Sequence, residues 1–348
     1  MATATEPPSA PASTPRGGAS NKVKLSLSLV RLGPLLMLAA IVIIMASLSP
    51  VFLTSRNLGN VGLEASVVAI LALGQLMVII TAGIDLSLGS LIALTSITGA
   101  LWIRDFDIVS GWLMIPTMIL TGGLAGAISG TLFVKGKIPH PFLPTLAMYL
   151  AARGVALLIS DGTPITGMPD TVRDLGSARI GDLPVAVLLV VGLGLLVHLL
   201  LSRITWGQWI YAIGSNREGA RRVGIPVDRV LISVYVLSGM SAGVAAIVVS
   251  GQTNSAYPTA GLNLELYAIA AVIIGGASFF GGRGTVIGAL VGALILGVIR
   301  NGLNLLGVDT AWQLVALGVV VVLAVELDVL RGHLETRLRT IRTDEKEA

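Results

Sequence analysis

Long apolar runs constrain this chain more than any other feature. A helix needs about 20 consecutive apolar residues to cross a bilayer core, and runs near that length follow one another through the 348 residues. They lie at 33–53, 61–82, 86–103, 112–134, 141–160, 183–201, 229–250, 264–280, 284–305 and 312–330. Because backbone groups in lipid must be satisfied within each helix or barrel, the chain is predicted to be an all-α polytopic membrane protein of about ten transmembrane helices. The short runs at 86–103 and 264–280 fit a re-entrant pair as well as two crossings.

Composition excludes an ordinary soluble domain and several kinds of site. Hydrophobic residues make up 54% of the chain and charged residues only 12%. The 42 glycines suit membrane helices that approach one another closely. The chain has no cysteine, so neither a disulfide nor a thiolate metal site can form. Its three histidines are scattered, and no metal site is predicted.

The chain divides into a tail, a membrane domain and a second tail. Residues 1–32 are expected to form a disordered N-terminal tail, because 1–24 are rich in Pro, Ala, Ser and Thr. The membrane domain is predicted at 33–330 and a cytoplasmic tail at 331–348. Of the 23 Lys and Arg residues, 17 fall on the side that holds both termini and four in the opposite loops. The positive-inside rule therefore predicts cytoplasmic termini and a cytoplasmic loop at 202–228.

The stretch at 205–226 is the longest charged interruption between the apolar runs. Ser215 and Glu218 have the spacing of a capping box, which pairs two free amide groups at a helix start. Gly224 and Pro226 supply a stop signal. The pattern predicts a helix of about two turns. Its small and charged side chains suit docking into a partner, and they also suit a basic helix lying on lipid headgroups.

A second interruption lies between the runs at 61–82 and 86–103. Gly83, Asp85 and Ser87 stand there, and a carboxylate at membrane depth is a candidate functional group. Asp85 and Ser87 also fit a simple cap of the following helix, and the two interpretations are compatible. A similar Gly-rich turn is expected at 279–284, where Arg283 would anchor the cytoplasmic side.

The two interruptions indicate an internal repeat. A shift of 199 residues brings Gly83 onto Gly282 and Gly89 onto Gly288. Paired Gly-interrupted segments in two halves are typical of transporters built from repeats. Gly83, Asp85, Ser87, Gly89, Gly282 and Arg283 are therefore the predicted pathway and gating residues.

Catalytic motifs are absent from the sequence. No GxxxxGK[ST] phosphate-binding loop occurs, so the chain is not predicted to hydrolyse ATP itself. Neither paired carboxylates in a pocket pattern nor a nucleophile beside a base can be found. A membrane enzyme is disfavoured, and no cofactor or nucleic-acid partner is predicted.

Five stretches together resemble a known family. They are ALGQLMVIITAGIDLSLGS (72–90), AARG (151–154), WGQWIYAIGSNREGARRVGI (206–225), YAIAAVIIGGASFFGGRG (267–284) and LILGVIRNGLNLLGV (294–308). In this order they are similar to the inner-membrane permease subunits of bacterial ATP-driven sugar importers of the ribose, xylose, arabinose and galactose type. They are less specific for the individual sugar.

The resemblance implies a vitamin-importer-like, type II permease fold and a set of partners. These are an ATP-binding subunit with tandem nucleotide-binding domains, a periplasmic or lipid-anchored sugar-binding protein, a second permease chain and a monosaccharide substrate. It also implies a coupling helix in the central cytoplasmic loop, where the motif covers Gly214, Ser215, Asn216, Glu218, Ala220, Arg221 and Gly224. ATP would then bind only to the partner subunit.

Four positions depart from the family pattern. Tyr267 stands where relatives often have an acidic residue and Leu317 where they often have a lysine. Since a lone buried charge is costly, this double loss predicts that Tyr267 and Leu317 are neighbours. Arg217 and Arg222 stand where acidic or apolar residues are usual, which suggests an acidic surface on the partner ATPase.

Other functions fit the pattern less well. A permease for branched-chain amino acids or nucleosides would have a related fold. A stand-alone secondary transporter or channel would need no coupling helix and would usually have ionisable residues along its pathway. Acidic residues are sparse in the predicted spans, which favours the importer permease.

Overall fold

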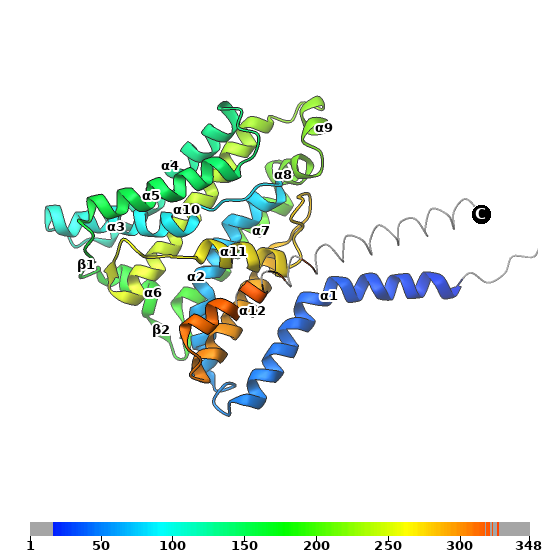
Figure 1. Ribbon diagram of the computed structural model, residues 1–348, viewed down its shortest axis with the longest axis horizontal. Coiled ribbons are helices and arrows are strands. Elements are labelled where there is room, and N and C mark those ends of the chain that lie inside the picture. The colour runs from blue at the N-terminus through cyan, green and yellow to red at the C-terminus, as the bar shows by residue number, and fades with distance from the viewer. Residues whose placement is uncertain (1–16, 317, 321, 323–325, 327–348) are drawn as a thin grey trace, which may run out of the picture.

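Helix α2 (Ser55–Ile80) forms the centre of the fold in the computed structural model, which describes residues 17–316, 318–320, 322 and 326 (Figure 1). Every residue from Ala65 to Ile80 is buried. A helix that is apolar on all sides needs neighbours on all sides. Helices α7, α10, α11 and α12 provide them.

The described elements are almost all helical. In chain order the helices are α1 (Gly17–Leu48), α2 (Ser55–Ile80), α3 (Leu88–Phe106), α4 (Gly111–Lys135), α5 (Phe142–Ile159), α6 (Asp170–Ser177), α7 (Val185–Arg203), α8 (Thr205–Ser215), α9 (Arg217–Arg222), α10 (Val227–Thr253), α11 (Leu264–Ile274) and α12 (Val286–Leu305). The strands are β1 (Ile165–Thr166), β2 (Arg179–Ile180), β3 (Leu183–Pro184) and β4 (Ser255–Ala256). β1 pairs with β4 and β2 with β3, both antiparallel, in two small ribbons between helices.

Six described helices are long and apolar enough to cross a membrane: α2, α4, α5, α7, α10 and α12. They confirm a polytopic helical protein. The predicted span at 264–280 is helical only as α11, whose 11 residues rise about 16 Å, roughly half of a bilayer core. The predicted span at 312–330 lies largely outside the described residues, so a total of ten crossings stays a prediction.

Glycines bring α4 and α10 into close backbone contact. A Cβ added to Gly122 would lie 2.1 Å from the Gly239 carbonyl oxygen, and one added to Gly239 would lie 2.0 Å from the Gly122 carbonyl oxygen. Neither position can hold a larger residue unless the helices separate. The abundance of glycine thus has the packing role expected of small residues between membrane helices.

The chain's N-terminal helix starts earlier than its apolar run. α1 begins at Gly17, inside residues 1–32, which the sequence assigned to a tail. Pro34 lies within α1 and cannot donate a helical hydrogen bond; Figure 1 shows this helix bending along its length. Residues 1–16 and 331–348 lie outside the described residues, and disorder there stays a prediction.

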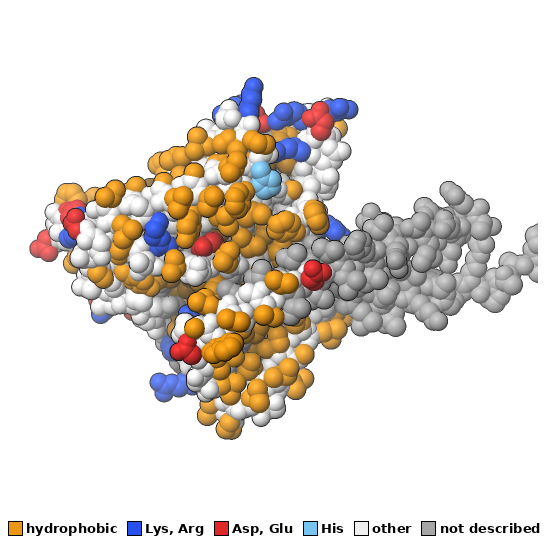
Figure 2. All heavy atoms as spheres, in the orientation of Figure 1, with side chains coloured by type: hydrophobic (Ala, Val, Ile, Leu, Met, Phe, Trp, Pro, Cys, Tyr) orange, Lys and Arg blue, Asp and Glu red, His pale blue; other side chains and the backbone are white. Residues whose placement is uncertain are grey.

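One end of the molecule is formed by α8, α9 and the loops near them, and we call it the α9 end (Figure 1). Figure 2 shows Lys and Arg side chains gathered at this end, while hydrophobic side chains cover much of the flank. The predicted cytoplasmic loop at 202–228 lies here. Exposed leucines such as Leu120 and Leu150 lie on the apolar flank, where lipid would cover them.

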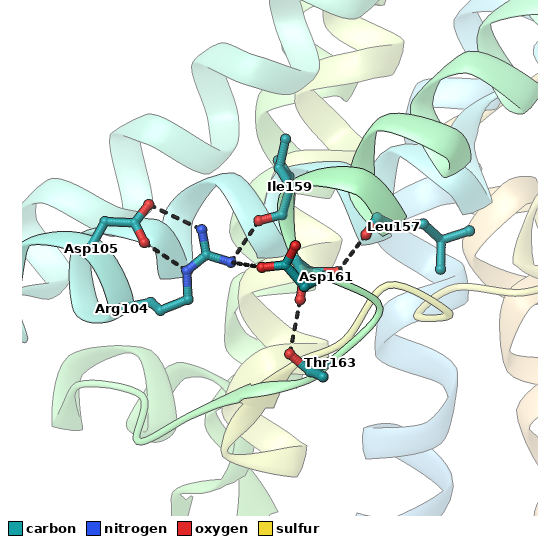
Figure 3. A network of polar contacts seen from close by, with 7 residues as sticks. Arg104, Asp105, Leu157, Ile159, Asp161 and Thr163 are labelled. Carbon is teal, nitrogen blue, oxygen red and sulfur yellow. Dashed lines mark hydrogen bonds and ion pairs between the residues drawn. The ribbon is translucent and has the colours of Figure 1, made fainter.

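At the opposite end, polar contacts hold the end of α3 to the end of α5. Arg104, near the end of α3, lies between Asp105 and Asp161 (Figure 3). It donates to Asp105 at 2.6 Å and to the carbonyl oxygen of Ile159 at 2.6 Å. The guanidinium holds the pKa of the Asp105 carboxyl below its usual range. These contacts join α3 to the segment that follows α5.

Candidate functional site

Helix α9 is closed at both ends by recognisable caps. Asn216 has an extended backbone, and its side-chain oxygen accepts the N–H of Gly219 at 2.8 Å. At the other end Gly224 has φ +84°, its N–H donates to Arg221, and the N–H of Ile225 donates to Ala220. This pair of bonds is a Schellman motif. The predicted stop at Gly224 is confirmed.

The predicted capping box is wrong by one residue. Ser215 is the last residue of α8, and its hydroxyl donates back to the Tyr211 carbonyl oxygen at 2.9 Å. Glu218 pairs with Arg222 at 3.3 Å and does not reach back to the helix start. Asn216 takes the capping role because the chain bends at that residue, where a short amide side chain can satisfy a free backbone donor.

Most of helix α9 is exposed, and one of its side chains is buried against the rest of the protein. Ala220 is buried, whereas Val223, which ends the helix, is 77% exposed. Arg221 pairs with Asp228 at 2.7 Å. Exposed ion pairs of this kind add little stability. α9 therefore presents a small basic surface with one exposed apolar side chain at its tip.

Arg217 and Arg222, two departures from the family pattern, have partners within the chain. Arg222 contacts Glu218. The guanidinium carbon of Arg217 lies 4.9 Å from the centroid of the Phe133 ring on α4, which is a cation–π contact. Burial lowers the pKa of the Arg217 guanidinium from its ordinary value, but a guanidinium stays charged at neutral pH. An acidic surface on a partner stays a prediction.

The first helix break, which we define as residues 81–87, separates α2 from α3 and is built around Asp85. One carboxylate oxygen accepts the Ser87 N–H at 3.0 Å and the Ser87 hydroxyl at 2.6 Å. The other accepts the Ser238 hydroxyl of α10 at 2.8 Å. Ser87 stands at the cap position of α3 but makes no side-chain cap; its backbone is already helical, with φ −75° and ψ −17°, whereas a cap residue usually has an extended backbone. The prediction that Ser87 caps α3 is wrong.

The backbone of Asp85 is also held. The Gln75 amide lies 3.2 Å from both its N–H and its C=O, and pairs with both when its oxygen faces the N–H. Gly83, in the same break, faces Tyr235: an added Cβ would lie 2.7 Å from the Tyr235 hydroxyl. Residues of two helices, Gln75 of α2 and Ser238 and Tyr235 of α10, thus contact the first break.

The second helix break, residues 275–285, separates α11 from α12. Gly281 and Gly282 have φ of +88° and +72°, values that favour glycine. The Gly281 N–H donates to Ser278, and the Ser278 N–H donates to Arg283, at 3.0 Å each. The predicted tight turn at 279–284 is confirmed, with Arg283 exposed on it.

The second break, the end of α2 and α8 meet at one backbone junction. The Gly282 N–H donates to the Ile80 carbonyl oxygen at 2.8 Å, which ties the second break to the last residue of α2. Gly214 of α8 lies against both, since an added Cβ would be 1.7 Å from the Ile80 oxygen and 2.7 Å from the Gly282 nitrogen. Tyr211, one turn earlier, donates to the Gly284 carbonyl oxygen at 2.9 Å. Burial raises the pKa of this phenol, so it remains a donor.

One predicted coupling residue and one predicted gating residue are therefore brought together, although they lie far apart in sequence. Gly214 contacts the Gly282 region directly. Gly83 and Gly282, paired by the predicted repeat, both lie in breaks, and Gly89 and Gly288 both lie in the first turn of the next helix. The coupling and gating roles themselves stay predictions.

Comparison with known proteins identifies the family. A family model described as "Branched-chain amino acid transport system / permease component" matches residues 57–325. The chain is 40% identical over 298 residues to the ribose import permease protein RbsC of Escherichia coli strain K12, covering 84% of this chain and 92% of that protein. The chain belongs to this permease family.

Two further relatives belong to the same group. The D-allose transport system permease protein AlsC of Escherichia coli strain K12 is 39% identical over 86% of this chain and 91% of its own length. The fructose import permease protein FrcC of Rhizobium meliloti is 36% identical over 76% of this chain and 75% of its own. No solved structure matches the chain. The resemblance to importer permeases of the bacterial inner membrane is confirmed.

In this permease, sequence reasoning missed Glu265, the acidic neighbour of Arg153. Arg153 donates to the carbonyl oxygens of Pro258 and Ala260 at 2.7 and 2.8 Å, and to that of Gly89 at 3.4 Å. These are the contacts of a structural anchor. Glu265 of α11 is only 5% exposed and lies close enough to interact electrostatically with Arg153. In the sequence, Glu265 is an isolated acidic residue at the start of an apolar run, and nothing there indicates that it lies near Arg153.

Replacing Arg153 with leucine is expected to lower the free energy of unfolding by about 2–4 kcal/mol. Three backbone carbonyl oxygens would lose a charged donor, and the buried Glu265 carboxylate would lose its neighbouring positive charge. The thermal midpoint of the detergent-purified protein measures this change. Arg153→Lys keeps the positive charge but loses the several N–H donors of the guanidinium. Its thermal midpoint should lie between those of the wild type and Arg153→Leu. An unchanged midpoint in Arg153→Leu would contradict the anchor role.

Proposed function

We propose that this chain forms the membrane pathway of an ATP-driven monosaccharide importer and that α9 is its coupling helix. The observation that supports this proposal most directly is the junction of Gly214, Ile80 and Gly282, which joins the segment that presents α9 to the end of α2 and to the second helix break. Three relatives over most of the chain are named as ribose, allose and fructose permeases. Those names favour a monosaccharide over the amino acid in the family description.

The geometry supports gating rather than chemistry. Glycine-rich breaks allow half-helices to move as units. An ATP-binding subunit closing beneath the α9 end would displace α9, and the junction would pass that displacement to the breaks as a rigid-body shift. The ATP would be bound and hydrolysed on that subunit.

The remaining parts follow from the same proposal. A sugar-binding protein, periplasmic or lipid-anchored, delivers substrate at the end opposite α9. A second copy of this chain completes the pathway across the membrane. Both termini and the 202–228 loop face the cytoplasm. The transported sugar is ribose-like.

Transport by the complete importer tests the proposal. Vesicles containing the permease, its ATP-binding subunit and the sugar-binding protein would be supplied with labelled pentoses and hexoses. Uptake that requires ATP and prefers one monosaccharide is the expected result. Uptake without ATP, or of a branched-chain amino acid in preference to sugars, would overturn it.

A substitution at the tip of α9 separates docking on a partner from lying on lipid headgroups. Val223→Asp is expected to reduce ATP-dependent uptake by about tenfold, equivalent to roughly 1.4 kcal/mol, and to weaken co-purification of the ATP-binding subunit. The thermal midpoint should not change, because Val223 is exposed. Val223→Ile serves as the matched control and should behave as wild type. Normal uptake by Val223→Asp would show that the tip does not dock.

A further inference from the structure

Aromatic side chains connect α9 to the first helix break through the interior. The Arg217 guanidinium carbon lies 4.9 Å from the centroid of the Phe133 ring. The Phe133 ring, which belongs to a side chain only 5% exposed, meets the Tyr235 ring edge-on, with centroids 6.1 Å apart and planes at 70°. Three elements, α9, α4 and α10, thus contribute one unbroken series of contacts.

Tyr235 ends this series at the break. It is 1% exposed, and its hydroxyl lies against Gly83 without a hydrogen-bond partner among the described residues. Ser238, three residues further along α10, donates to Asp85 at 2.8 Å. The same stretch of α10 therefore contacts the first break twice, through Gly83 and through Asp85.

The chemistry of these contacts suits them to transmit displacement. Packed interiors resist compression, so a buried ring that is pushed moves its neighbour. Aromatic rings with few rotatable bonds lose little of that motion to rotamer changes. The cation–π contact attracts the Arg217 guanidinium to the face of the Phe133 ring, so a displacement of either side chain acts on the other. A network of packed side chains is one route by which separate sites are coupled.

We propose that Phe133 and Tyr235 are positioning residues for transport, which couple the position of Arg217 on α9 to the conformation of residues 81–87. This inference rests on the proposed function and adds to it a second route. The backbone junction at Gly214 reaches the second break and the end of α2, whereas the aromatic series reaches Gly83 and Asp85. α9 is thereby connected separately to each break.

The test measures labelled ribose taken up per ATP hydrolysed by the complete importer in liposomes. Phe133→Leu, which keeps an apolar side chain but removes the ring, is expected to lower this ratio by about fivefold or more, roughly 1 kcal/mol. Phe133→Tyr, which restores a ring, is expected to restore the ratio. Arg217→Gln, a change at the partly exposed end of the series, is expected to lower the ratio in the same direction. A double-mutant cycle should show that Arg217→Gln and Phe133→Leu are not additive.

Phe142→Leu is the matched control, because Phe142 begins α5 and lies outside the series. It should leave the ratio unchanged. A wild-type ratio in Arg217→Gln or Phe133→Leu would overturn the proposal. So would a fall in the thermal midpoint of Phe133→Leu at an unchanged ratio, since that is the outcome of a purely structural role. If Phe133→Leu does not fold, Arg217→Gln decides alone.

Failure of the proposed function would be seen first in the wild-type protein. Ribose uptake that is independent of ATP, with every component present, would refute both proposals. ATP-dependent uptake by wild type, with an unchanged ratio in the variants, would refute only the aromatic route.

Discussion

Gly214→Ala is expected to lower ATP-dependent sugar uptake by about tenfold or more while the protein still inserts into the membrane. The added Cβ would lie 1.7 Å from the Ile80 carbonyl oxygen and 2.7 Å from the Gly282 nitrogen. Both are backbone atoms, and they are the two atoms of the hydrogen bond that joins the second break to the end of α2. Overpacking typically costs about 1–3 kcal/mol, and about 1.4 kcal/mol is a factor of ten in rate.

Gly192→Ala is the control for this prediction. Gly192 lies on α7, and nothing lies within 4 Å of an added Cβ there, so uptake should not change. Uptake by both variants would be measured at equal amounts of membrane-inserted protein. Wild-type uptake in Gly214→Ala would show that the junction tolerates separation and transmits nothing.

The sequence predicted the positions at which the apolar helices are interrupted better than the hydrogen bonds and caps found there. Gly224 was recognised as a helix stop because a positive φ favours glycine, which is a local property. The helix start was misplaced because Ser215 and Asn216 are both good caps, and the bend between α8 and α9 decides between them. That bend depends on contacts of α8 with the rest of the fold.

Interior partners could not be predicted from the sequence. Phe133 and Tyr235 lie in apolar runs where any aromatic residue would serve equally well as core. Their contact depends on the close approach of α4 and α10 through Gly122 and Gly239. Asp85 was recognised because its charge stands out, but Ser238, the residue of α10 that donates a hydrogen bond to it, is one of many serines.

The predicted neighbours Tyr267 and Leu317 can be compared only in part. Tyr267 lines a small cavity with Leu296, Arg300, Gln313 and Val320. Gln313 and Val320 precede and follow Leu317 by about one helical turn, whereas Leu317 lies outside the described residues. Their proximity stays a prediction, and the cavity shows that Tyr267 faces the segment concerned.

Substitutions of Asp85 are expected to show whether transport needs its hydrogen bonds, which hold the first break in place, or its negative charge. Asp85→Ala should reduce uptake by about a hundredfold, roughly 2.7 kcal/mol, because it leaves two serine hydroxyls and one N–H without their acceptor in a buried site. Each buried polar group without a partner costs about 1–3 kcal/mol. The first break would then lose its hydrogen bond to α10.

Asp85→Asn distinguishes the two roles. An asparagine oxygen can accept both donors of Ser87, and its amide can donate to the Ser238 hydroxyl, which also accepts. Uptake within about threefold of wild type, under 1 kcal/mol, is therefore expected if Asp85 braces the break. Equal loss in Asp85→Asn and Asp85→Ala would instead show that the negative charge is required. A required charge at membrane depth is typical of ion-coupled transporters, so that outcome would count against a pathway driven only by ATP through α9.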